Sequence, residues 1–561
     1  MSAERCEWAD EQRRLGGRND VKLIWIGVRN PASVARALEL MPCFNGDPRV
    51  KVEFVLCTGS RFAQGTKELI KQHGWPVISV KKALKLIKKE RGPDLIVSAS
   101  ERIDFRPFHP VPVIVLPHGL ALHKIVPEPD LRKSRQSGVV PEKHMAMGHI
   151  RMVATHPDIE DQLLRISTET KERVVIGGDT SYDLIAISKR RRPEYRARFG
   201  VGENRKLIAI SSTWGEGSLL AEWEEALCAF LGSLPSSEYR VALMLHPNMW
   251  AWRAKHGIEA ILEPHLKRGG LLVVLPDYWH SLVVAADAFV GDIGSPTLYA
   301  AMAGVPTAFG VYRDSVVAPD TVMAEAKHLI RHIDRHGDLR LQIDDLIAGH
   351  DPALAETLRA KLIAKPLDAL EGFRRLFYEK LQIDPPARPM PAEVAAYPQM
   401  MSEQVWSHRD YPTVVGDTVV LQRFPHGARP SPEFADKEGH LVSESEEADN
   451  HAIENASVVV NPSACESDEI EGQLARLRDD WPGSKLVGVG SEEGCELLFH
   501  ALGRPAERFS VKVLARKLLV PVSALASAVH SLILRARDVV GRFVVRFGKH
   551  SVALLVTRVA L

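Results

Sequence analysis

The chain has 561 residues, 45% hydrophobic and 25% charged, which is the composition of a globular protein with about three domains. Lysine and arginine total 72 against 71 aspartate and glutamate residues, and this net charge of +1 argues against a whole-chain nucleic-acid binder, which is usually strongly basic. The six cysteines form no CxxC pair, so neither a disulfide framework nor a zinc ribbon is predicted.

From Val21 onward, short apolar runs alternate with helical stretches. In the first half the predicted strands are 21–28, 51–59, 94–100, 111–119 and 174–178, with helices at 31–41 and 65–73. In the second half they are 206–213, 239–248, 271–276, 288–292 and 306–311, with helices at 217–231, 250–264 and 295–302. Strands that alternate with helices indicate parallel βαβ units. We therefore expect two Rossmann-type domains, 20–200 and 201–384, that face a cleft.

The remainder of the chain differs in composition. The start of 385–415 is rich in proline, and this segment is predicted to be a linker. Weaker apolar runs predict a small α/β module over 416–510. Basic residues interleave with apolar ones in 511–561, so we interpret this stretch as a basic amphipathic helical tail that docks on an anionic membrane surface. The alternative is a pair of helices that packs on the neighbouring module.

The near-zero net charge conceals two oppositely charged stretches. Twelve acidic residues and one basic residue lie between Glu433 and Glu471, whereas nine basic residues and one acidic residue lie between Val511 and Leu561. Such asymmetry indicates a surface for a charged partner. The opening residues are polar, and no charge-free run reaches the roughly 20 residues of a spanning helix. We expect a cytoplasmic protein, peripheral on the cytoplasmic face of the membrane if the tail docks there.

Two histidines directly follow buried strands, at positions that face the cleft between such domains. His118 ends the run VPVIVLP, and His246 ends the run VALML. Histidine titrates near neutral pH, so His118 is a candidate general base for an acceptor hydroxyl. His246 is a candidate electrostatic clamp on phosphate oxygens. The alternative for each is a buried histidine with a structural role.

The segment GDIGSPTLYAAMAGVP at 291–306 has the features of an anion site. A strand ends at Asp292, Gly294 permits a tight turn, and Ser295 is predicted to cap a helix whose first turn contains Pro296. The amides and dipole of a helix start favour a phosphate group. A second turn, over 210–220, adds hydroxyls and amides. The predicted phosphate-binding residues are Ser211, Ser212, Thr213, Asp292, Gly294, Ser295 and Pro296. An ordinary packing helix and an ordinary turn are the alternatives.

Five segments, in this order, are similar to motifs of the CDP-glycerol glycerophosphotransferase family. They are PHG at 117–119, GGDTSYDLI at 177–185, SSTWG at 211–215, LHPN at 245–248 and ADAFVGDIGSPTLYAAMAGVP at 286–306. The resemblance spans about residues 20–340. It implies an α/β fold of the GT-B type, a pair of Rossmann-type domains that face a cleft, here followed by the smaller C-terminal α/β module with its helical tail.

The resemblance also implies an activity. Family members transfer a polyol-phosphate unit from a CDP-linked donor to a hydroxyl of a cell-envelope polymer or a lipid-linked acceptor. His118 matches the family's base and His246 the histidine that assists with the donor phosphates. Asp292 and Ser295 align with the segment that contacts the nucleotide diphosphate. The expected partner is thus a nucleotide-activated small molecule, with no cofactor, no metal and no nucleic acid.

The chain departs from the family pattern at three places. Ile293 and Gly294 replace a tyrosine and a serine, SSTWG lacks an arginine, and 178–180 replaces a proline–arginine pair. These departures leave the donor open. GGDTSYDLI and GDIGSPTLYAA also resemble segments of UDP-N-acetylglucosamine 2-epimerases. The alternatives are therefore a UDP-sugar glycosyltransferase or 2-epimerase-like enzyme, and a catalytically degenerate GT-B binding or scaffold protein.

Overall fold

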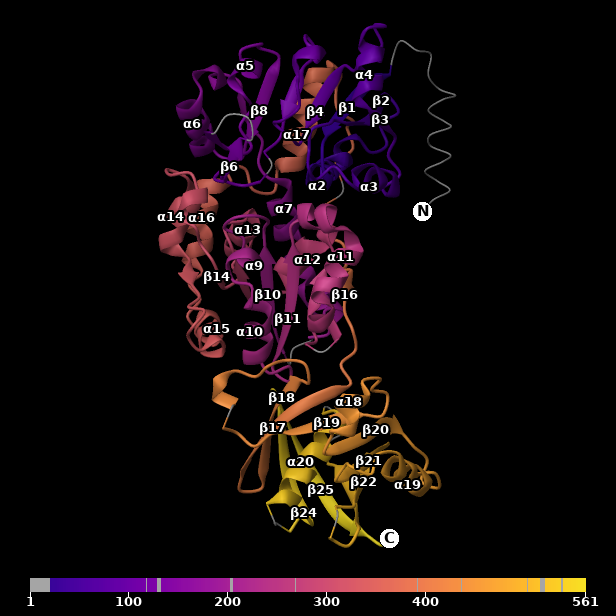
Figure 1. The fold of residues 1–561 in the computed structure, drawn as a ribbon. Helices are drawn as coiled ribbons and strands as arrows, with labels where there is room; N and C mark the ends of the chain where they lie inside the picture. The colour runs from indigo at the N-terminus through magenta and orange to yellow at the C-terminus, as the bar shows by residue number, and fades with distance from the viewer. Residues whose placement is uncertain are drawn as a thin grey trace.

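Three units follow one another along the molecule, coloured indigo to purple, magenta to salmon, and orange to yellow (Figure 1). The computed structural model describes residues 21–561 except 118, 129–132, 202–204, 268, 391, 435, 502, 515–519 and 536–537. The first two units are Rossmann-type domains, and the third is a closed sheet.

The first unit contains a parallel seven-stranded sheet in the order β3-β2-β1-β4-β5-β8-β9. Its strands are β1 (Lys22–Val28), β2 (Val50–Leu56), β3 (Val77–Ser79), β4 (Leu95–Ser98), β5 (Val113–Val115), β8 (Ile150–Ala154) and β9 (Val174–Ile176). Its helices are α2 (Pro31–Leu38), α3 (Thr66–Gln72), α4 (Val80–Ile87), α5 (Glu142–Met145) and α6 (Pro157–Ile166). The next two helices, α7 (Thr180–Ser188) and α8 (Arg192–Arg198), instead bury Tyr182, Ile185 and Tyr195 in the core of the second unit. The hairpin β6 (Ile125–Glu128) and β7 (Lys133–Gln136) stands apart from the sheet. The central strand β1 is almost wholly apolar and its last five residues are buried, because helices cover both faces of the sheet.

The second unit repeats this plan with the sheet order β15-β14-β13-β10-β11-β12-β16. Its strands are β10 (Lys206–Ser212), β11 (Tyr239–Leu245), β12 (Leu272–Val274), β13 (Ala288–Gly291), β14 (Thr307–Phe309), β15 (Arg331–His332) and β16 (Met400–Met401). Its helices are α9 (Leu219–Glu222), α10 (Ala226–Ser233), α11 (Pro247–Lys267), α12 (Trp279–Ala285), α13 (Ser295–Met302), α14 (Val322–Leu329), α15 (Leu339–Ala348) and α16 (Ala353–Leu362). The first six strands of each sheet, in chain order, have the Rossmann arrangement 3-2-1-4-5-6. The predicted GT-B-like pair is confirmed.

The helix α17 (Ala369–Leu381) returns to the first unit (Figure 1). Phe373 and Phe377 are fully buried in the same core as Ile24 and Ile26 of β1. The predicted boundary at 384 therefore differs from the structure, because α17 buries its aromatic face against the first sheet. The proline-rich stretch that follows has no helix or strand among its described residues up to Gln399.

The third unit is a closed sheet of nine strands in the order β17-β18-β24-β25-β23-β22-β21-β20-β19. These are β17 (Ser407–Val415), β18 (Thr418–Pro425), β19 (His440–Glu444), β20 (Val458–Ala464), β21 (Leu486–Ser491), β22 (Gly494–Phe499), β23 (Glu507–Val513), β24 (Gly541–Phe547) and β25 (His550–Val559). The helices of this unit are α18 (Asn450–Glu454), α19 (Ile470–Asp480) and α20 (Val522–Leu534). The predicted linker over 385–415 is too long, because β16 pairs with β12 and β17 belongs to the closed sheet.

The predicted helical tail over 511–561 is wrong. The described part of this stretch completes β23 and forms α20, β24 and β25. Helix α20 is buried along nearly its whole length in the core of the closed sheet, which explains why its sequence is apolar on every face. In β24, Phe543 and Val545 are buried while Arg542 and Arg546 are exposed, and this period of two is that of a strand. The amphipathic helix on which the membrane expectation rested is therefore absent from the described residues, and none of the described helices is long and apolar enough to cross a bilayer.

Candidate active site between the two Rossmann units

The loop after β5 meets the start of α13 from the opposite unit. The backbone N–H of Leu120 donates a hydrogen bond to Ser295 Oγ at 3.1 Å. Gly119 lies so close to Ser295 that a Cβ atom at position 119 would be 2.5 Å from that oxygen, so a larger residue here would displace the Ser295 hydroxyl. His118 directly precedes this contact in the chain but lies outside the described residues.

The predicted capping role of Ser295 is wrong. Gly294 occupies the N-cap position of α13, and no side chain caps the helix. The Ser295 hydroxyl instead serves the contact between the units, where it accepts from Leu120. Pro296 is half-buried in the first turn of α13, as predicted, and its missing N–H leaves no amide unsatisfied there.

The segment that follows Leu120 is fixed to the second unit by contacts with the main chain of that unit. His123 Nε2 lies 2.5 Å from the carbonyl oxygen of Ile293, and the His123 carbonyl accepts from Ala318 N–H at 2.7 Å. Lys124 forms a backbone bridge with Val317. Burial lowers the pKa of His123 to about 4, so its ring is neutral near pH 7. These contacts hold the two units in register at the site.

Asp292 lies beneath the site rather than on its surface. Its side chain is fully buried. One carboxylate oxygen accepts hydrogen bonds from the backbone N–H of Thr213 at 2.7 Å, the Thr213 hydroxyl at 3.0 Å and the N–H of Leu219 at 2.8 Å. The other accepts from Gly294 N–H at 2.9 Å. Burial raises the pKa of Asp292, although these amides and Lys124 oppose the effect. Asp292 therefore organises the two loops and does not itself face a ligand.

The three hydroxyl residues at the end of β10 are also part of the framework. Ser211, Ser212 and Thr213 are buried. Ser212 Oγ accepts from the N–H of Leu220 at 3.1 Å, and the Thr213 hydroxyl donates to Asp292. Gly294 packs so tightly on Thr213 that an added Cβ would approach its methyl group to 2.5 Å. The surface that a ligand meets here begins at the next residue, Trp214, which is half-buried.

A cluster of aromatic and cationic side chains from both units lies at this surface. His246 follows β11, whose last residue pairs with Ser212 of β10. The rings of His246 and Trp214 have centroids 6.5 Å apart, and Phe62 of the first unit packs edge-on against Trp214 at 4.8 Å. Lys124 Nζ lies 5.0 Å from the centre of the Trp214 ring and donates to the Trp214 carbonyl at 3.2 Å. Burial lowers the pKa of Lys124, while the charge of Asp292 raises it.

Lys124 and Phe62 were not predicted from the sequence as site residues. Neither follows a buried strand, and each reaches the site through an irregular segment. The only local signal was a lysine within the otherwise apolar run LALHKIVP, where a buried or half-buried cation needs a partner.

The motif GGDTSYDLI forms a buried ion network between the units. Asp179 caps α7 by accepting from Tyr182 N–H at 2.8 Å, and it also accepts from Arg36 Nη2 at 2.7 Å and from the hydroxyl of Tyr299 at 3.0 Å. Burial alone would raise the pKa of Glu39, but the Arg36 guanidinium and His280 lower it to about 2. Residues 178–180 thus contribute to a buried network of charged side chains between the units.

Comparison with known proteins finds similarity in fold to several solved structures. No family model and no curated protein matches the chain. A solved structure of the wall teichoic acid polymerase TagF is 10% identical, with 67% of this chain and 94% of that chain covered and a TM-score of 0.45. A UDP-GlcNAc 2-epimerase from Neisseria meningitidis bound to UDP-GlcNAc is 14% identical, with 64% and 99% covered and a TM-score of 0.38. A putative UDP-N-acetylglucosamine 2-epimerase from Listeria monocytogenes is 13% identical, with 66% and 100% covered and a TM-score of 0.40. These likenesses are of fold alone.

The arrangement has the elements needed to bind a polar, phosphorylated group. A lysine, an imidazole and the start of α13 lie around a surface that two aromatic rings partly shield from water. A cation that is desolvated attracts an anion more strongly than one in bulk water. The site lies at the carboxyl ends of both parallel sheets, where open α/β folds bind their ligands.

Proposed function

We propose that this chain is a transferase that moves a glycerol-phosphate or related polyol-phosphate unit from a CDP-linked donor to a hydroxyl of a cell-envelope polymer or lipid-linked acceptor. One observation carries the proposal: the motif segments 119–120, 213–214, 246 and 294–295, distant in sequence, converge on one surface between two Rossmann units. A transferase needs such convergence, because donor and acceptor must be held in line for reaction.

In the proposed reaction the acceptor oxygen attacks the phosphorus that carries the glyceryl group, the bond to the CMP phosphate breaks, and CMP leaves. His118 takes the proton from the acceptor hydroxyl as general base. Lys124, His246 and the amides at the start of α13 stabilise the negative charge on the phosphate oxygens. Trp214 and Phe62 exclude water, which would otherwise compete as acceptor.

The first experiment identifies the nucleotide base of the donor by measuring the melting temperature of the chain with different nucleoside diphosphates. We expect CDP to raise the melting temperature more than UDP, GDP or ADP at equal concentration, because a ligand stabilises only the state that it binds. A larger shift with UDP would favour the UDP-sugar alternative. Product analysis then separates the chemistries, since polyol-phosphate transfer from CDP-glycerol releases CMP, whereas glycosyl transfer from a UDP-sugar releases UDP.

His246 offers a matched pair of variants for the activity assay. His246→Ala is expected to lower kcat/KM for CMP release by about 100-fold or more, as the loss of one transition-state donor does elsewhere. The control is His256→Ala in α11, whose side chain is 97% exposed, and this variant should retain full activity. Tight CDP binding with no CMP release from any acceptor preparation would instead indicate the scaffold alternative.

A further inference from the structure

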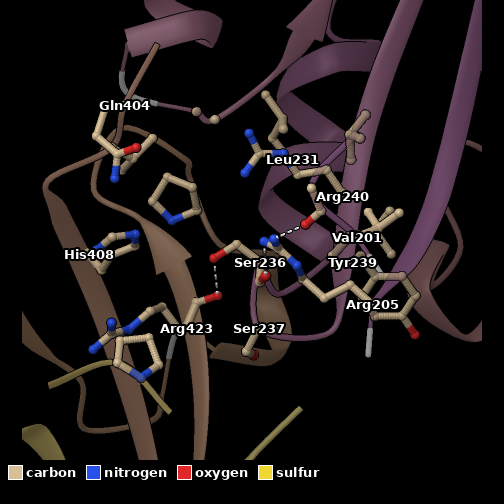
Figure 2. Close-up of a pocket in the computed structure, with 18 of the residues that line it drawn as sticks. Val201, Arg205, Leu231, Ser236, Ser237, Tyr239, Arg240, Gln404, His408 and Arg423 are labelled. Carbon is tan, nitrogen blue, oxygen red and sulfur yellow. Dashed lines mark hydrogen bonds between the residues drawn. The ribbon is translucent and has the colours of Figure 1, made fainter. Parts of the chain in front are cut away.

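A cavity of about 650 Å³ lies between the second and third units. Figure 2 shows Arg205, Arg240 and Tyr239 on the side of the second unit, and His408 and Gln404 on the side of the third. Its volume is within the range of small-molecule sites, about 300–1,000 Å³. Both units must be present to form it, since each supplies one wall.

This cavity is distinct from the candidate active site. Arg205 directly precedes β10, and Arg240 is the second residue of β11, so both lie at the amino ends of these strands. Ser212 and His246 lie at the carboxyl ends. Because a strand rises by about 3.3 Å per residue, the two sites are about 20 Å apart.

Three residues that line the cavity each have a buried polar atom without a hydrogen-bond partner within the described structure. These atoms are the Nε atom of Arg240, the hydroxyl of Ser237 and the Nδ1 atom of His408. Ser237 is only 5% exposed, which makes its unsatisfied hydroxyl costly. Unpartnered polar atoms in residues that line one cavity from two units indicate a ligand with several hydrogen-bonding atoms, which these side chains reach by a change of rotamer.

The wall formed by the second unit is cationic and not neutralised. Among the described residues, Arg205 donates only to the backbone carbonyls of Gly200 and Ser236. Neither Arg205 nor Arg240 forms an ion pair with a described carboxylate. Burial, and then the neighbouring charge of Arg205, lower the pKa of Arg240 to about 10. On the opposite wall Arg423 is already paired with Asp410 through two bonds of 2.7 Å.

Two carboxylates line the cavity. Glu444 is the last residue of β19 in the third unit, and Glu403 lies in the segment between β16 and β17. Glu444 accepts from the hydroxyl of Ser523 at 3.1 Å, and Glu403 is exposed. The positive charge therefore remains concentrated at Arg205 and Arg240. Two guanidinium groups at close quarters repel each other unless an anion lies between them.

We propose that this cavity is a second ligand site, which binds the phosphate group of a small phosphorylated molecule between Arg205 and Arg240. Ser237 donates its hydroxyl to the same group, and His408 contacts the bound molecule from the third unit. Because both walls contact the ligand, its binding ties the closed sheet to the second Rossmann unit. The site is independent of the donor site proposed above.

The test is calorimetric titration of the full chain with inorganic phosphate and with pyrophosphate. Saturable binding is expected, with an affinity that falls as salt rises. Arg240→Gln should weaken it by about tenfold or more, because a hydrogen bond to a charged partner is lost. It should not lower the melting temperature without ligand, since a repulsive charge is removed. Arg165→Gln, which removes an exposed arginine of α6, should bind like the native chain.

His246→Ala serves as the reference for the other site: it should affect anion binding at the candidate active site only and leave the binding that depends on Arg240 unchanged. The proposal is overturned if neither anion binds saturably, if Arg240→Gln binds as tightly as the native chain, or if binding is lost in His246→Ala and kept in Arg240→Gln. Should Arg240→Gln fail to fold, Ser237→Ala replaces it, with a smaller loss of affinity expected.

Discussion

Asp292 illustrates how a residue can serve a site without touching its ligand. The motif predicts a phosphate-binding aspartate, yet a carboxylate would repel a phosphate group. In the structure it accepts four hydrogen bonds from two loops, and those loops carry Trp214 and Ser295 to the surface. Its negative charge also faces Lys124, so it helps to keep that lysine charged.

Replacement of Asp292 by asparagine is therefore expected to destabilise the second unit by about 3 kcal/mol. The amide puts an N–H₂ group against N–H donors, so buried donors lose their acceptor. The measurement is the urea midpoint followed by tryptophan fluorescence. Asp320→Asn, at an exposed position with positive φ that asparagine tolerates, is the control. Equal midpoints for the two variants would contradict the assigned role.

At the site, the sequence predicted residues that follow strands and missed those that do not. The positions of His246 and Ser295 follow from the rule that strand ends face the cleft. Whether a hydroxyl there is free or already bonded depends on partners about 80 residues away, as for Thr213 and Asp292. No local pattern encodes such partners, so burial of Ser211, Ser212 and Thr213 could not be predicted.

Among the elements, the strands β24 and β25 were both mistaken for parts of a helical tail. The segment RFVVRF has apolar residues at positions that suit either a short strand or one turn of an amphipathic helix. The observed burial alternates with the period of a strand: Arg542 is exposed, Phe543 buried, Val544 half-buried and Val545 buried. Over so few residues, the choice is made by pairing with β18 and β25, which the sequence does not show.

Adjacent residues of β24 provide a direct test. Phe543→Ala should destabilise the third unit by about 3–5 kcal/mol, because a side chain that is 7% exposed leaves a cavity. Arg542→Ala, one residue earlier on the opposite face, should change stability by less than about 0.5 kcal/mol. Thermal unfolding followed by circular dichroism measures both. Similar losses at the two positions would contradict the alternation of exposed and buried side chains along β24.

On the scale of the whole molecule, the two Rossmann units were predictable because each repeats a strong local pattern. The third unit was not, since its sheet joins strands from 407 to 559 and encloses a helix that lies between two of them in sequence. Helix α17 was likewise assigned to the wrong unit. The apolar face of a helix predicts that it packs on a sheet but does not indicate which sheet. Local sequence patterns do not specify which distant strands pair or which sheet a helix packs against.

Buried histidines in two units predict how the molecule responds to acid. Burial lowers the pKa of His123 and His440 to about 4, and that of His408 and His530 to about 3, against a value of about 6.5 in the unfolded chain. Their neutral forms therefore stabilise the fold fully above pH 6.5. This contribution is lost as the pH falls from 6.5 toward 4, because the unfolded chain then binds more protons.

Three of these four histidines belong to the third unit, so we expect it to unfold first on acidification. Around His440 lie Asp410, Arg423, Arg409 and Lys485. The pKa of Asp410 is lowered, so its own effect on stability changes only below about pH 4. His530→Leu removes a titrating ring whose two nitrogens have no described partner, and the variant should unfold at a lower pH than the native chain. Near-UV circular dichroism from pH 7.5 to 4.5 measures the transition. His256→Gln should follow the native curve, and a His530→Leu curve that coincides with it would show that burial of this histidine does not set the acid response.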